Sequence, residues 1–157
     1  MISRRTQTLL TRAHAWVYRL TGGRFGGRLL GMQQVLLTTR GRQSGLPRTT
    51  PLSAFPLGAG SSAGSAAATA GALSAGALVL VASDGGRPQH PQWYQNLLAD
   101  PDVVVQRGRT SVRMRARVAT DVEREELWPR VVAAYRGYAD YQGRTERRIP
   151  LVICEPR

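Results

Sequence analysis

The chain has 157 residues, enough for one domain with a sizeable core but too few for separate cofactor and substrate domains. It has 22 basic residues, all of them arginine, and 10 acidic residues, which gives a formal net charge of +12. A protein of this charge attracts anionic ligands such as phosphates, polycarboxylates, nucleic acid or anionic lipid. The single Cys154 excludes a disulfide framework and a multi-cysteine zinc site. No apolar run reaches the ~20 residues of a membrane span, so we expect a cytoplasmic protein.

Residues 4–20 predict an amphipathic helix at the start of the chain. Arg5, Arg12 and Arg19 recur every seven positions, while leucine, alanine and tryptophan side chains occupy the opposite face. Two interpretations remain open. The apolar face covers the core of the domain, or the helix contacts an anionic membrane peripherally or covers a hydrophobic substrate site.

A β-hairpin is predicted next. Val35–Thr39 and a second segment from Arg48 to Phe55 have strand character, and the glycine-containing basic loop Arg40–Gly45 separates them. Residues 57–77 contain only alanine, glycine, serine, threonine and two leucines. Such a segment cannot bury enough surface to order itself, so we expect a flexible insertion at a hairpin tip.

The remainder of the chain predicts several strands that suit antiparallel pairing, a short helix between them, and then a helix and a last strand. Thr120 and Glu123 form a capping box at the start of a helix that runs towards Tyr135, and Pro129 is expected to kink or restart it. The other predicted elements are strands at Leu78–Ala82, 103–105, 112–118 and Ile149–Cys154, and a short helix at Pro91–Leu98. This order favours an α+β, mainly β fold in which one small barrel carries peripheral helices.

Common catalytic motifs are absent from the sequence. His14 and His90 are the only histidines, they lack metal-ligand spacing, and no P-loop, H-E-x-x-H or G-x-S-x-G segment occurs. We therefore expect no metal site, and a bound organic cofactor becomes the more plausible source of chemistry.

The basic loop is the strongest candidate for binding such a cofactor. Backbone amides beside two glycines, the hydroxyls of Ser44 and Thr49, and the guanidinium groups of Arg42 and Arg48 converge within one hairpin. Together they suit a phosphate. The alternative is that the loop is a solvated basic turn.

Four segments in order resemble one known family. They are T-T-x-G-R-x-S-G-x-P-R-x-x-P-L from Thr38, A-S-x-G-G followed by P-x-W-Y-x-N-L-x-A-x-P, Y-x-x-Y-x-x-Y-Q from Tyr135, and I-P-x-x-x-x-E-P from Ile149. From about Trp16 to Pro156, apart from the insertion, the chain resembles the deazaflavin-dependent nitroreductases of mycobacteria and related bacteria. The resemblance implies a split β-barrel related to flavin-binding barrels. It also implies that reduced coenzyme F420, an 8-hydroxy-5-deazaflavin, reduces quinones, nitroimidazoles or similar hydrophobic acceptors.

The resemblance also implies site residues. The coenzyme's phosphate and acidic tail would contact Arg42, Gln43, Ser44, Arg48, Thr49, Thr50, Pro51 and Leu52. Its chromophore would be lined by Val81, Ala82, Ser83, Trp93, Tyr94 and Asn96. Tyr135, Tyr138 and Tyr141 would border the acceptor, and Tyr138 or Ser83 would polarise its oxygen. Without the family, an aromatic stripe in the core explains the tyrosines, and core packing explains Trp93.

Two positions depart from the family pattern. Gln43 stands where lysine is frequent, and Asp84 stands where lysine or a neutral residue is common, so two contacts to an anion are weakened unless Arg87 compensates. Two other functions stay open: a coenzyme-storage protein with little turnover, and a basic nucleic-acid-binding module suggested by the arginines at 113, 115 and 117. Because aromatics are not interleaved with those arginines, we expect no nucleic-acid partner.

Overall fold

The computed structural model describes residues 28–29, 32–57 and 76–157. The helix predicted at residues 4–20 and residues 58–75 of the predicted insertion lie outside the described residues. The strands are β1 (Arg28–Leu29), β2 (Met32–Arg40), β3 (Pro47–Pro56), β4 (Leu78–Val81), β5 (Asp102–Arg107), β6 (Thr110–Val118) and β7 (Leu151–Pro156).

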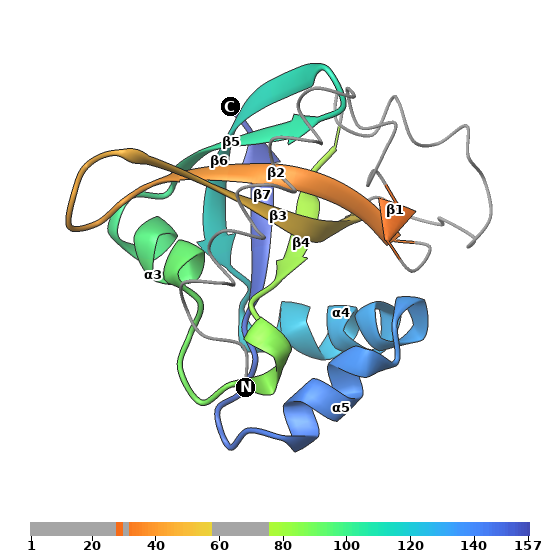
Figure 1. The fold of residues 1–157 in the computed structure, drawn as a ribbon. Coiled ribbons are helices and arrows are strands. Elements are labelled where there is room, and N and C mark those ends of the chain that lie inside the picture. The colour runs from red at the N-terminus through yellow and green to blue at the C-terminus, as the bar shows by residue number, and fades with distance from the viewer. Residues whose placement is uncertain (1–27, 30–31, 58–75) are drawn as a thin grey trace.

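The strands form an antiparallel barrel. The sheet has seven strands in the order β1-β2-β3-β4-β7-β6-β5, and an additional pairing between β2 and β5 closes it (Figure 1). β2 and β3 form the predicted hairpin, with Gln33 opposite Ala54 and Arg40 opposite Pro47. The mainly β barrel with peripheral helices is confirmed, and each predicted strand is present with boundaries shifted by a few residues.

The barrel is incompletely paired along β3. β2 pairs with β3 from Pro47 to Ala54, whereas β4 pairs only with the last three residues of β3, from Ala54 to Pro56. Within the described part of the chain, the β4-side edge of residues 47–53 therefore has no strand partner.

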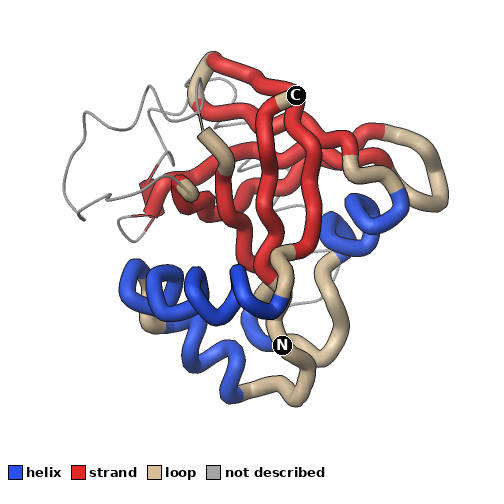
Figure 2. Tube along the Cα trace, turned by 180° about the vertical axis from the view of Figure 1, so that it is seen from behind, coloured by secondary structure: helices blue, strands red, loops and turns tan. Residues whose placement is uncertain are grey.

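Four short helical elements surround the barrel: η1 (Asp84–Gly86), α3 (Gln92–Ala99), α4 (Asp121–Ala134) and α5 (Gly137–Gly143). Both views show α4 and α5 together below the barrel, while α3 lies against its side (Figures 1 and 2). No helix of the described residues is both long enough and apolar enough to cross a membrane.

The predicted capping box of α4 is confirmed. The Thr120 hydroxyl accepts from the Glu123 amide at 3.3 Å, and the Glu123 carboxylate accepts from the Thr120 amide at 2.8 Å. Arg117 donates two further hydrogen bonds to that carboxylate, each 2.8 Å long. The Arg117 guanidinium and the Thr120 amide together lower the pKa of Glu123 to about 2.

The prediction of a restart at Pro129 is wrong, because α4 continues through this residue to Ala134. Proline removes one helical hydrogen bond, but the buried Leu127 and Val131 on either side of it pack against the barrel. Helix packing on an apolar face contributes more than the single backbone bond that is lost.

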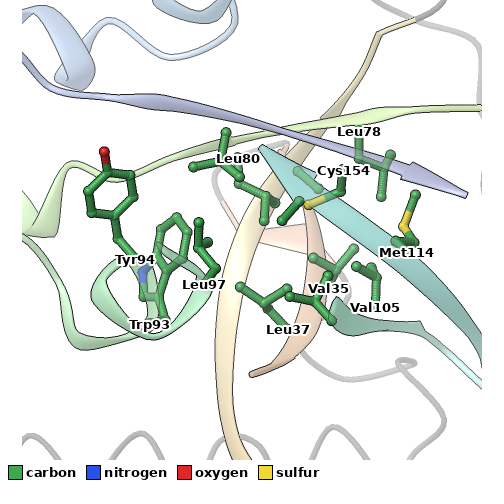
Figure 3. Packing of buried hydrophobic residues seen from close by; sticks show 14 of the residues in the cluster. Val35, Leu37, Leu78, Leu80, Trp93, Tyr94, Leu97, Val105, Met114 and Cys154 are labelled. Carbon is green, nitrogen blue, oxygen red and sulfur yellow. The ribbon is translucent and has the colours of Figure 1, made fainter. Parts of the chain in front are cut away.

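Two apolar cores explain how these elements are held. The first fills the barrel with inward-facing side chains such as Leu37, Leu80 and Met114, and Trp93 and Leu97 of α3 extend it at one end (Figure 3). Cys154 has no exposed surface and lies in this core.

The second core lies outside the barrel wall. It packs Val79 of β4 and Ile153 of β7 against Leu127, Val131 and Tyr138 of the two lower helices. β4 is therefore buried on both faces, which explains its uninterrupted apolar sequence. Burying each of these aliphatic side chains contributes ~1.5–3 kcal/mol.

Candidate functional site

The basic loop between β2 and β3 has a defined backbone. The Gly41 amide donates to the Leu46 carbonyl at 2.9 Å, and the Gly45 amide donates to the Gly41 carbonyl at 2.7 Å. Gly45 has a φ of +67°, a conformation that glycine adopts without a steric penalty. The two glycines of the predicted loop are thus explained by the turn itself.

The loop is fastened to α3 through Asn96. The Asn96 side chain is buried, accepts from the Arg42 amide at 3.2 Å, and donates to the Thr39 hydroxyl at 3.2 Å. On the surface, Arg42 Nη1 also donates to Gln92 Oε1 at 2.7 Å. Two regions of the sequence that are 54 residues apart are therefore rigidly joined.

The charged groups of the loop are available to an anion. Arg42 and Arg48 are exposed, and no carboxylate of the described residues lies within ion-pair distance of either. Arg48 Nη2 donates to the Ser44 hydroxyl at 3.4 Å, and that hydroxyl also accepts from the Leu46 amide at 3.3 Å. Gln43 is exposed on the same loop. This donor set fits a phosphate or carboxylate ligand.

The β3 residues that follow the loop divide between two faces. Leu52 packs against the barrel core, and by the alternation of a strand Thr50 points the same way. Thr49 faces outward, where its hydroxyl pairs with that of Thr38 at 2.9 Å. Pro51 and Ser53 follow on this outer face, and the Ser53 hydroxyl accepts from Gln34 Nε2 at 2.7 Å.

The outer face of β3 leads from the basic loop to an aromatic cluster. Ser53 lies four positions after Thr49, which corresponds to roughly 13 Å along a strand. Beyond Ser53, the Phe55 ring meets the Tyr138 ring edge to face, with centroids 6.1 Å apart. One strand therefore connects the predicted phosphate-binding residues with the predicted acceptor-binding tyrosines.

The three tyrosines do cluster, but not through the single helix that their spacing predicts. Ring centroids are 5.3 Å apart for Tyr135 and Tyr138, 6.3 Å for Tyr135 and Tyr141, and 6.1 Å for Tyr138 and Tyr141. Tyr135 caps the end of α4 with an extended backbone, and α5 begins anew at Gly137. A Cβ on Gly137 would lie 2.3 Å from the Tyr135 ring, so glycine is what lets that ring fold over the junction.

The hydroxyls of these tyrosines differ in environment. Tyr138 is only 7% exposed, and burial raises the pKa of its phenol to about 12 despite an opposing hydrogen bond with Ser53. Tyr135 and Tyr141 are half-buried, with their hydroxyls 3.5 Å apart. Their hydrogen bond and partial burial raise the pKa of Tyr141. The phenols of Tyr138 and Tyr141 therefore stay protonated at neutral pH and can donate hydrogen bonds.

The remaining predicted residues meet at the lower end of the barrel. Val81 ends β4 and Ala82 follows it, both buried, and Ser83 comes next, half-buried, before η1. Trp93 and Tyr94 are buried in α3 with their rings edge to face, 6.3 Å between centroids. Both side chains belong to the barrel core, which for Trp93 agrees with the core-packing alternative.

Arg147 is a residue of this region that sequence reasoning missed. Its guanidinium donates to the carbonyls of Ala82, Ser83 and Arg87 at 3.1, 2.7 and 2.8 Å. It belongs to none of the resembling segments and lies more than 50 residues along the chain from the loop that it holds. No signal in the sequence marks such a contact.

Asp84 has a cationic neighbour that the sequence did not suggest. Burial lowers the pKa of the Arg147 guanidinium, and the nearby Asp84 carboxylate opposes that shift. Arg147 is thus a cation near Asp84 that the sequence did not identify, in addition to the suggested Arg87.

Comparisons with known proteins agree with this arrangement. The profile of a family described as F420H(2)-dependent quinone reductase matches residues 10–59 and 55–156. An F420H(2)-dependent quinone reductase of Mycobacterium tuberculosis is 34% identical over 160 residues, covering 99% of this chain and 96% of the relative.

Two solved structures extend the similarity to the fold. One of an F420-H2 dependent reductase has a TM-score of 0.60 at 38% identity, covering 78% of this chain and 93% of the other. Another, described as a domain-swapped dimer, has a TM-score of 0.63 at 35% identity and covers 95% and 99% of the two chains.

Proposed function

The chain belongs to the F420H(2)-dependent quinone reductase family, whose members use coenzyme F420, and we propose that it passes a hydride from the reduced coenzyme to a quinone-like or nitroaromatic acceptor. The observation that carries this proposal is the course of β3. It starts next to the exposed Arg42 and Arg48, which have no carboxylate partner in the described part of the chain, and it ends beside three clustered tyrosines.

The basic loop supplies the binding energy for the anionic part of the coenzyme. Arg42, Ser44 and Arg48 present charge-assisted donors, and Gln43 and the β3 residues from Thr49 to Leu52 continue the contact surface. The buried Asn96 keeps the loop in place against α3. A donor set fixed before binding loses less conformational entropy when the ligand arrives.

The lower end of the barrel is proposed to face the chromophore. Val81 ends β4 there, Ala82 and Ser83 follow it, and α3 brings Trp93 and Tyr94 to the same end. Because those side chains are buried, they contribute a firm wall and exclude water rather than offering polar contacts.

When bound, the reduced deazaflavin supplies a hydride, a two-electron equivalent. The residues of the chain orient the acceptor for it. The tyrosine cluster offers flat apolar surface, and Tyr138 remains protonated at neutral pH, so its hydroxyl can donate to an acceptor oxygen as negative charge develops there. Ser83 is proposed to assist from the neighbouring loop. Solvent can protonate the reduced product.

Binding experiments test the proposal. We expect the reduced coenzyme to bind and FMN to bind more weakly, and Arg42→Ala and Arg48→Ala each to weaken coenzyme binding by ~1–3 kcal/mol, or about 5- to 150-fold in Kd. Arg113→Ala is the matched control, because Arg113 is an exposed arginine of β6 without a carboxylate partner among the described residues. Added salt should weaken binding to the wild type.

Two results would contradict this assignment. Normal binding by both loop variants, or equal losses in Arg113→Ala, would mean that the basic loop does not hold the anion. Turnover decides between the enzyme and a storage protein, because a storage protein would bind the reduced coenzyme without oxidising it when a quinone is added.

A further inference from the structure

The segment between β4 and α3 is held by one side chain that the proposed chemistry does not use. Arg147 Nε donates to the Arg87 carbonyl at 2.8 Å, Nη1 to the Ala82 carbonyl at 3.1 Å, and Nη2 to the Ser83 carbonyl at 2.7 Å. A fourth contact joins Nη1 to His90 Nδ1 at 3.2 Å. Only a planar guanidinium offers donors in this arrangement.

The backbone that Arg147 holds is strained. Asp84, Gly85 and Gly86 have consecutive positive φ angles of 46°, 66° and 79°. For Asp84 this conformation is unfavourable, and such backbone persists only where surrounding contacts determine it. The carbonyls on both sides of the strained turn, those of Ser83 and Arg87, are the ones to which Arg147 donates.

The same turn also touches the tyrosine cluster. A Cβ on Gly86 would lie 2.6 Å from the Tyr141 carbonyl oxygen, so the backbone of η1 packs directly on α5. On its other side the segment leads through His90 into α3, where the His90 and Tyr94 rings lie 4.9 Å apart. The position of this segment therefore sets where Ser83 lies relative to the tyrosines.

We propose that Arg147 is a positioning residue, which fixes the Ser83 backbone between the β4 end of the barrel and the tyrosine cluster. This inference rests on the proposed function, because positioning Ser83 matters for turnover only if the acceptor lies beside it.

The first test needs no coenzyme. A guanidinium only donates, so in the wild type His90 Nδ1 is unprotonated and the ring proton lies on Nε2. Burial and Arg147 together lower the pKa of His90. NMR of Arg147→Ala should show a raised His90 pKa and loss of the fixed tautomer, with a His14→Gln variant used to assign the two histidines. An unchanged His90 would overturn the contact and leave the proposed function standing.

The second test measures turnover with a quinone. Arg147→Ala should lower kcat roughly tenfold while KM for the quinone and Kd for the coenzyme change less than about threefold. Arg148→Ala is the matched control, because Arg148 forms only a surface ion pair with Asp121, and it should stay within about twofold of wild type. Equal effects of the two variants, or wild-type turnover in a folded Arg147→Ala, would overturn the positioning role.

A conservative variant covers the case in which the alanine variant does not fold. Arg147→Lys keeps the charge but not the planar fork, so its turnover should lie below wild type and its His90 pKa should be shifted. Wild-type values for both in Arg147→Lys would overturn the proposal. Should the wild type itself fail to oxidise the reduced coenzyme, the proposed function fails, and the His90 measurement alone decides the contact.

Discussion

Replacing Tyr138 with phenylalanine separates acceptor handling from folding. The substitution removes one hydroxyl and keeps the ring, so the edge-to-face contacts with Phe55 and Tyr135, at 6.1 and 5.3 Å between centroids, are retained. The lost hydrogen bond involves Ser53, which still accepts from Gln34. We therefore expect a stability loss of only ~1 kcal/mol.

Turnover should respond more strongly than stability. If the Tyr138 hydroxyl donates to the acceptor in the transition state, Tyr138→Phe should lower kcat with a quinone tenfold or more, about 1.4 kcal/mol, while coenzyme Kd stays within roughly threefold. Tyr138→Ala is a poorer probe. This residue is only 7% exposed, and removing its ring leaves a cavity that costs ~3–5 kcal/mol.

Ser53→Ala provides the matched control for this experiment. It removes the same hydrogen bond, together with the one that Ser53 accepts from Gln34, but leaves the Tyr138 hydroxyl. Its melting temperature should therefore fall at least as far as that of Tyr138→Phe, while its kcat stays near wild type. A melting curve and a rate on the same preparation give both quantities. Wild-type turnover in folded Tyr138→Phe, or equal kcat losses in both variants, would refute the role of this hydroxyl.

Three further predictions concern the supports of the site. Asn96→Ala should cost ~1–3 kcal/mol in urea unfolding, because a buried amide and a hydroxyl lose their partner, and an unchanged midpoint would contradict the fastening of the loop. Gly86→Ala should lower the melting temperature more than Gly85→Ala. Both glycines have positive φ, but only a Cβ on Gly86 would lie 2.6 Å from the Tyr141 carbonyl oxygen, so equal effects would argue against that packing. The pKa of Glu123 is lowered from 4.5 to about 2, so its contribution to stability is complete above about pH 4.5 and is lost as pH falls towards 2; Glu123→Gln should remove this part of the pH dependence, and an unaltered acid profile would refute it.

Local sequence patterns determined much of the fold. Alternating apolar residues from Val112 onward, the capping box at Thr120 and the glycine-containing loop at Gly41–Gly45 each act through neighbours in the chain, and each element is present in the structure. The basic loop was identifiable for the same reason, because its donors lie within a few residues of one another. The resemblance to the family added the order of the segments and the coenzyme.

Only the tertiary structure decided what depends on contacts between distant segments. The spacing of Tyr135, Tyr138 and Tyr141 is typical of one helix, yet the cluster forms across a break at Gly137, where packing of the Tyr135 ring replaces helical geometry. The fastening of Arg42 to Asn96 joins positions far apart in the chain. Arg147 binds a loop more than 50 residues away through backbone carbonyl groups. Because every residue carries a carbonyl, no pattern of side chains in the sequence predicts this contact.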